Sequence, residues 1–251
     1  MSHVFETVNV EPAYRRVATQ IAARIVDRSL REGEPLPPEL ELAAQLGVNR
    51  STVREALREL ESGGLIGRRR GTKRLVVTRP KATAVAERVS HALALNDVTV
   101  AEVWETLMML APPAAEAAAQ RRAATDLAAL HAAADAFVAG SKRTRDSVAA
   151  VGAFFRAIVA ATRNRALALA FEPALGLLEE SLILMIDRVP QARGRIETAQ
   201  RKLLGALEAA DAPLALEWMR KHIRDFRRGF EVAGIDLQRR VSMRAAAPRA
   251  R

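Results

Sequence analysis

The chain contains no cysteine and few aromatic residues, with 7 Phe, 2 Trp and 1 Tyr among 251 residues. Without cysteine there is no disulfide framework and no thiolate metal site, which fits a reducing compartment. No apolar run is long enough to span a bilayer, and residues 1–11 lack the basic start and apolar core of an export signal. We therefore expect a cytoplasmic protein without a membrane segment.

The sequence also lacks the common motifs of enzymes. No glycine-rich phosphate loop follows a predicted strand, no nucleophile elbow occurs, and no two histidines stand at metal-binding spacing. The acidic pair Glu179-Glu180 is explained more simply as a solvated helix face. We expect no enzyme activity and no cofactor. The alternative is an enzyme that processes nucleic acid, which saturable, sequence-specific duplex binding without chemistry would exclude.

The positive charge is concentrated in two segments of a chain whose net charge is +10. Residues 50–81 hold ten basic and three acidic residues, and residues 237–251 hold five basic and no acidic ones. Residues 82–236 are balanced, with nineteen of each sign. A chain of this length accommodates two domains. The distribution indicates a discrete nucleic-acid-binding module joined to a neutral domain.

Two short helices joined by a tight turn are predicted directly before the most basic segment. Prolines 37 and 38 favour a first helix from Glu39 to Leu46, Gly47 ends it, and Asn49 can cap a second helix. The apolar positions of both helices recur at helical spacing, as in a helix-turn-helix. The exposed face of the second helix supplies the side chains that we expect to contact DNA: Arg50, Ser51, Thr52, Arg54 and Arg58.

A two-stranded basic hairpin, or wing, is predicted after Gly63-Gly64. The helical period changes there to alternation at Leu65-Ile66, and alternation resumes at residues 75–77. A solvated hairpin tip is the simpler explanation of an arginine run, but a neighbouring helix-turn-helix favours DNA contact. The expected contacts are Arg68, Arg69, Arg70, Gly71 and Lys73. A further helix, from Ala13 to Leu30, should pack behind the pair.

The predicted domain boundaries are a winged helix-turn-helix over residues 1–78, a linker over 79–81, a helical domain over 82–236 and a disordered basic tail over 237–251. The second domain is rich in Ala and Leu and nearly free of strand patterns. Its expected helices are Ala82–Leu95, Val100–Arg122, Asp126–Ala139, Asp146–Thr162, Arg165–Asp187, Ala192–Ala210 and Ala212–Val232.

Local features of these helices carry their own expectations. Thr99 and Thr125 are natural N-caps. The pair Pro112-Pro113 should kink the second helix, and Pro173 should break or bend the fifth.

The first domain resembles the DNA-binding domain of GntR-family bacterial transcription regulators. The similarity is carried by Leu36-Pro37-Pro38-Glu39, Leu42-Ala43, Gly47 to Leu57 and Gly64-Leu65. The resemblance to the FadR branch implies DNA contacts at the positions of Arg50, Ser51, Thr52, Arg54 and Gly71. Many relatives have arginine where this chain has Leu40, so one contact to phosphate or base is missing.

The helical domain resembles the FCD effector-binding domain of the same branch, an antiparallel bundle around a pocket. Many such domains bind a divalent metal through one Asp and three His, and the matching positions hold Val151, Phe155, Gln200 and His222. Val and Phe have no lone pair, so we expect no metal. Trp104 and Met108 stand where relatives have a pocket arginine and glutamate.

These replacements favour an effector that is apolar, aromatic or acyl-CoA-like, although the same side chains could simply fill the cavity as core. The expected fold class is therefore mainly α: an N-terminal winged helix-turn-helix plus a C-terminal all-helical antiparallel bundle. The resemblance implies a repressor, or less often an activator, that binds operator DNA as a homodimer under the control of a small molecule. The remaining alternative is an architectural DNA binder that responds to no ligand.

Overall fold

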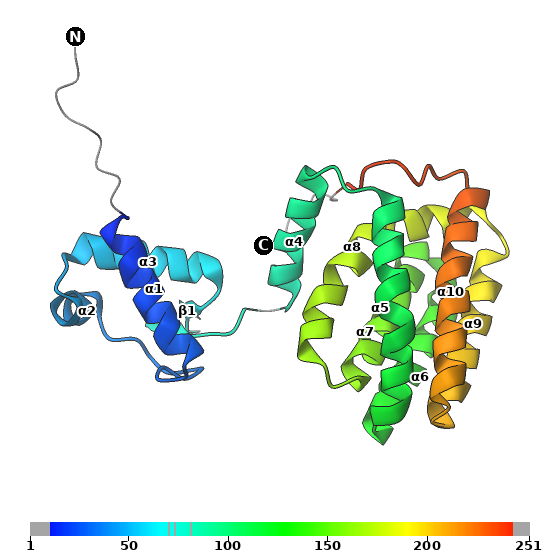
Figure 1. Cartoon of the computed structure of the whole chain (residues 1–251), viewed down its shortest axis with the longest axis horizontal. Helices are drawn as coiled ribbons and strands as arrows, with labels where there is room; N and C mark the ends of the chain where they lie inside the picture. Colours follow the sequence, from blue (N-terminus) through cyan, green and yellow to red (C-terminus); the bar gives the residue numbers. More distant parts are fainter. Residues whose placement is uncertain (1–10, 70, 73, 81, 243–251) are drawn as a thin grey trace, which may run out of the picture. The chain divides into compact units, whose positions relative to one another are not determined.

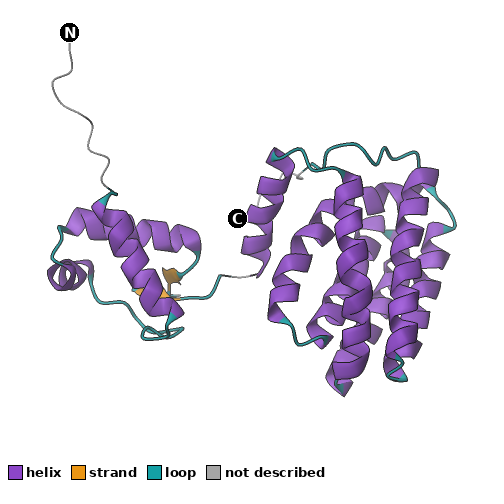
Figure 2. Ribbon diagram, viewed as in Figure 1, coloured by secondary structure: helices purple, strands orange, loops and turns teal. Residues whose placement is uncertain are grey.

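The computed structural model describes residues 11–69, 71–72, 74–80 and 82–242, and its chain divides into two compact units between residues 81 and 82 (Figure 1). Both units are dominated by helix, and the strands lie in the first unit (Figure 2). The expected fold class is confirmed by this architecture. Within the described ranges, no helix is long and apolar enough to cross a membrane.

The first unit contains three helices and a hairpin: α1 (Ala13–Val26), α2 (Glu39–Leu46), α3 (Arg50–Gly63), β1 (Ile66–Arg68) and β2 (Leu75–Val77). The left-handed backbone of Gly47, with φ 63°, ends α2, and Asn49 caps α3. Helix α1 ends four residues before the expected Leu30. The reason is a tight turn in which Arg28 has φ 66° and the Leu30 amide donates to the Arg24 carbonyl at 2.8 Å.

The core of the first unit joins all five elements. Val17 of α1, Val53 and Leu57 of α3, and Ile66 and Val77 of the hairpin are buried together. The strands pair antiparallel with Ile66 opposite Val77. This core fixes the angle between α2, α3 and the hairpin, so the polar face of α3 stays outside.

The second unit is a bundle of seven α-helices and one short 3-10 turn over its described residues. Helix α5 packs on α10, α6 on α7, and α4 on α8. The helices are α4 (Ala82–Leu95), α5 (Val100–Arg121), α6 (Ala124–Ala139), α7 (Thr144–Ala161), α8 (Arg165–Arg188), α9 (Ala192–Glu208) and α10 (Ala212–Val232), with η1 at Gly140–Lys142.

The internal prolines do not interrupt these helices, and one expected N-cap was wrong. Pro173 does not break α8, because it is buried against neighbouring helices and a proline removes only one hydrogen bond of the helix. Helix α5 likewise runs without interruption through Pro112 and Pro113. Thr125 is not the N-cap of α6. The Asp126 carboxylate accepts a bond from the Ala123 amide at 2.7 Å instead, so the helix starts two residues early.

Part of the expected disordered tail is ordered. Residues 237–242 cross to the loop between α4 and α5, where the Val241 amide donates to the Val98 carbonyl at 2.8 Å and the Val100 amide donates to the Arg239 carbonyl at 3.0 Å. Val241 is buried in the bundle core. Val241 lies between Arg240 and Ser242, so a single buried side chain gives no periodic pattern from which this segment could be predicted. Residues 243–251 lie outside the described residues.

Candidate DNA interface and effector cavity

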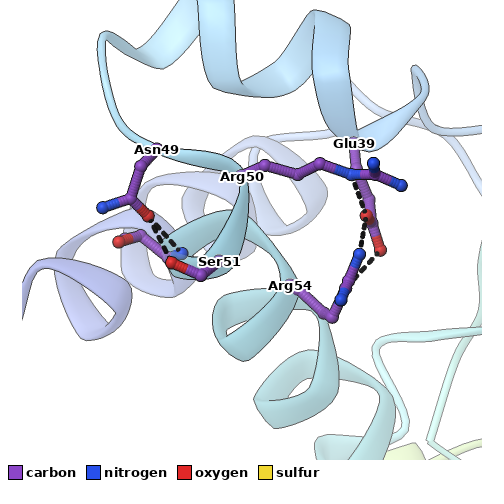
Figure 3. A network of polar contacts seen from close by, with 6 residues as sticks. Glu39, Asn49, Arg50, Ser51 and Arg54 are labelled. Carbon is purple, nitrogen blue, oxygen red and sulfur yellow. Dashed lines mark hydrogen bonds and ion pairs between the residues drawn. The ribbon is translucent and has the colours of Figure 1, made fainter.

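The cap of α3 orders the first turn of the predicted recognition helix. The Asn49 Oδ1 atom accepts bonds from the Thr52 amide at 2.8 Å and from the Ser51 hydroxyl at 2.7 Å (Figure 3). Ser51 and the two arginines Arg50 and Arg54 are exposed. The turn therefore presents fixed side chains to solvent at the end of a helix that attracts anions.

Glu39 joins the two exposed arginines from the first turn of α2 (Figure 3). The Arg50 Nε atom donates to Glu39 Oε2 at 2.8 Å. Arg54 donates through Nε to Oε1 at 3.2 Å and through Nη2 to Oε2 at 3.0 Å. Hydrogen bonds from Arg54 and then from Arg50 lower the pKa of the Glu39 carboxyl to about 2. The Glu39 carboxylate is therefore charged at neutral pH, and it holds both guanidinium groups in place.

Sequence reasoning missed Glu39. The only available signal was its position, because an acidic residue directly after Pro37-Pro38 begins a helix that packs on α3. Its neighbour Leu40 is 73% exposed. Where relatives have an arginine, this chain therefore has a solvent-exposed apolar side chain.

The wing places its glycine at the turn. Gly71 has φ 77°, and an added Cβ there would meet no atom within 4 Å. The Thr72 amide donates to the Arg69 carbonyl at 3.0 Å, and Arg68 forms an ion pair with Glu61 at 3.5 Å. Arg58 is exposed on α3. Arg70 and Lys73 lie outside the described residues.

In the second unit, a cavity of about 170 Å³ lies among α5, α7, α8 and α10, and Val151 and Phe155 line it. Two other predicted pocket residues do not. The Trp104 indole donates to the Ile223 carbonyl at 2.7 Å and lies 4.9 Å from the Arg227 guanidinium, so α10 holds it. Met108 is only partly buried against the core.

The remaining two predicted pocket residues, Gln200 and His222, are buried polar groups. The His222 ring stacks on the Phe155 ring with 5.6 Å between the ring centroids, and its centroid lies 4.4 Å from that of Phe226. Burial lowers the pKa of His222 to about 3, so the imidazole is neutral. Among the described residues, neither Gln200 amide atom nor His222 Nε2 has a hydrogen-bond partner. In proteins such groups are usually satisfied by ordered water or a ligand.

These residues do not fit the divalent metal that many FCD domains hold. Val151 and Phe155 offer no lone pair, and one imidazole with one neutral amide makes a poor transition-metal site. No group of three or more His, Cys, Asp or Glu side chains that could hold a metal ion occurs in the described parts of the chain.

The fold and the basic first turn of α3 define a winged helix-turn-helix DNA-binding protein with a separate helical domain. Residues 13–76 match the bacterial regulatory proteins of the gntR family, and residues 102–225 match the FCD domain. An uncharacterized HTH-type transcriptional regulator of Mycobacterium tuberculosis is 33% identical over 85% of this chain and 88% of its own length. The chain belongs to the GntR family of bacterial transcription regulators.

More distant proteins agree with this assignment. The Glc operon transcriptional activator of Escherichia coli K12 is 23% identical over 94% of this chain and 95% of its own length. The solved structure of a Streptococcus agalactiae GntR protein covers 86% of this chain and 99% of its own, with a TM-score of 0.62 and 22% identity, and so shares the fold. The chain is a DNA-binding transcription regulator and not an enzyme.

Proposed function

We propose that this regulator belongs to the FadR branch and represses its genes by binding a pseudo-palindromic operator as a homodimer. The direct base contacts come from the first turn of α3, and the wing contacts phosphate and the minor groove. The observation that carries this proposal is the Glu39 carboxylate, which holds Arg50 and Arg54 side by side at the start of α3. Arginines held in this way can each donate two bonds to a guanine edge.

The remaining contacts are proposed in two groups that differ in what they read. Ser51 and Arg58 lie on the same helix face as the two arginines, and Thr52 lies in the first turn of that helix. All three contact phosphates or base edges in this proposal. The wing residues Arg68, Arg69, Arg70, Gly71 and Lys73 mainly fix the position of the protein on the duplex, since a glycine at the turn lets the backbone approach a phosphate.

A small molecule bound in the second unit controls operator affinity in this proposal. The cavity wall of Val151 and Phe155 supports an apolar or aromatic effector over a carboxylate bound through a metal. We place this activity in the cytoplasm, where chromosomal DNA lies. Repression is the proposed sign of control, and a reporter gene behind the operator would measure it.

The test of the DNA contacts first selects an operator from a random duplex library and then measures binding by fluorescence anisotropy. Arg54→Ala should weaken operator binding by about 1–3 kcal/mol and weaken random duplex binding far less, because a base contact is lost. Arg69→Ala in the wing is the matched control and should weaken both duplexes alike. Equal losses for Arg54→Ala on both duplexes would make Arg54 a phosphate contact and contradict the assignment.

A further inference from the structure

We propose that the cavity among α5, α7, α8 and α10 binds one neutral hydroxyaromatic ring of the phenol class. The inference rests on the proposed control by an effector and specifies the chemistry of that effector. Its evidence is the size of the cavity, the apolar floor, two glycines at the opening and the charges around them.

The size of the cavity limits its ligand to a single ring. Its volume is about 170 Å³. A cavity of about 150 Å³ in a protein core accommodates one benzene molecule. A long acyl chain or a coenzyme A thioester is several times larger, so the acyl-CoA class expected from the sequence does not fit this cavity.

The floor of the cavity is apolar and partly aromatic. Leu107, Val151 and Phe155 are at most 2% exposed, and Phe226 is 3% exposed. The Phe155 and Phe226 rings lie 6.1 Å apart with their planes tilted by 45°. Because the Phe155 ring already stacks on His222 and Phe171, an aromatic ligand would contact it by its edge, a geometry that aromatic pairs favour.

Two glycines line the cavity, Gly152 of α7 and Gly176 of α8. Gly176 is exposed and Gly152 is half-buried, so we place the opening of the cavity beside them. A glycine inside a helix costs about 1 kcal/mol relative to alanine. An added Cβ at Gly176 would meet no atom within 4 Å, so helix packing does not require glycine there. The absence of a side chain at Gly176 leaves the way into the cavity open, whereas the Arg156 guanidinium occupies the space beside Gly152.

The opening offers a hydroxyl group both a hydrogen-bond donor and a hydrogen-bond acceptor. Arg156 bonds Glu172 through Nε at 2.8 Å and Nη2 at 2.7 Å, while an added Cβ at Gly152 would lie 3.0 Å from Nη1. Nη1 is therefore at the opening as a donor. Glu179, which also lines the cavity, supplies an acceptor.

The balance of charge selects against an acid. Arg156 carries one positive charge, and Glu172 and Glu179 carry two negative charges, so the opening repels a carboxylate. A phenolic hydroxyl is neutral at pH 7, accepts from Arg156 and donates to Glu179. Phenol is thus a better fit than benzoate.

The test measures binding of phenol, benzoate and octanoate to the full chain by calorimetry and by the shift in melting temperature. Phenol should bind and raise the melting temperature, and the other two should not at the same concentration. Gly176→Leu should raise the phenol Kd tenfold or more by closing the opening. Gly205→Leu is the control, since Gly205 is a helical glycine of α9 with no atom within 4 Å of an added Cβ.

Glu179→Gln tests the charge at the opening and should narrow the preference for phenol over benzoate. The inference is overturned if Gly176→Leu binds phenol like wild type, if octanoate or benzoate binds as well as phenol, or if Glu179→Gln leaves the preference unchanged. Operator affinity is measured in parallel to separate the two proposals. A protein that binds its operator but not phenol contradicts this inference alone, whereas phenol binding without any change in operator affinity supports the cavity and contradicts effector control.

Discussion

Glu39 places a negative charge between two arginines on the surface that we propose binds DNA, which is itself a polyanion. Both arginines are exposed, and each could otherwise move freely among phosphates. A fixed carboxylate lowers the general attraction of the surface for DNA but holds the guanidinium groups in one geometry. Glu39 therefore exchanges non-specific affinity for base discrimination.

Replacing the Glu39 carboxylate by a neutral amide tests this role. Glu39→Gln should strengthen binding to random DNA, make binding to random DNA more salt-dependent and lower the ratio of operator to random affinity, because two freed arginines can pair with phosphates. Anisotropy titrations over a range of salt concentrations measure all three quantities. Equal weakening on both duplexes would instead mean that Glu39 only stabilises the fold.

A second single residue, His222, makes the stability of the bundle core depend on pH. Its pKa is about 3 in the folded chain, whereas an unfolded histidine has a pKa of about 6.5. Between these values the unfolded chain binds a proton that the folded chain does not, so the free energy of unfolding falls as pH falls below about 6.5. The loss is at most about 1.4 kcal/mol for each pH unit.

His222→Phe should therefore make the free energy of unfolding depend less on pH. Phe keeps an aromatic ring between Phe155 and Phe226 and has no group to protonate. Urea unfolding of the second unit at pH 5 and pH 7 should differ less in the variant than in wild type. His91→Phe, at an exposed histidine of α4, is the control and should retain the wild-type difference. Parallel pH profiles for wild type and His222→Phe would refute the argument.

At the scale of single elements, the sequence predicted features that depend on local chemistry better than features that depend on long-range packing. Gly47, Asn49 and Thr99 determine helix ends through their own backbone or side chain, and the structure has those ends where the sequence placed them. Trp104 was assigned to the pocket from its position in the family, but its indole bonds a carbonyl 119 residues away. Such a contact depends on how α5 and α10 pack, which no local pattern contains. Glu39 was missed for the same reason.

The segment after α10 shows what such a packing contact contributes. A chain that stops at Asp236 would lose the buried Val241 and its bond to the Val98 carbonyl. Burial of a valine side chain stabilises by about 2 kcal/mol, so the melting temperature of the second unit should fall by roughly 4–8 °C. Differential scanning calorimetry measures this change.

A second truncation is the control for the first. Stopping at Ser242 leaves every described contact of residues 237–242 in place, so its melting temperature should match that of the full chain. Equal melting temperatures for the chain that stops at Asp236 and for the full chain would show that this segment adds nothing to the stability of the bundle.

At the scale of the whole molecule, we expect a dimer because the DNA-reading surface of one chain is small. Among the described residues, the side chains that we propose contact DNA lie on α3 and in the hairpin. Each wrong base pair costs about 1–3 kcal/mol of binding free energy. A surface that reads only a few base pairs therefore binds its operator too little more tightly than the many non-specific sites of the genome. Two copies related by a two-fold axis double the number of base pairs read and require half-sites of matching symmetry.

The whole-molecule prediction is therefore a particle of twice the 27.3 kDa chain mass that protects two half-sites about one helical turn apart. Light scattering at micromolar concentration measures the mass, and hydroxyl-radical footprinting measures the spacing. Inverting one half-site should abolish tight binding, while inserting five base pairs between the half-sites should weaken it strongly, because the second copy then meets the opposite face of the duplex. A monomer that protects one half-site with full affinity would contradict the dimer and would require a single winged helix to supply all of the sequence specificity.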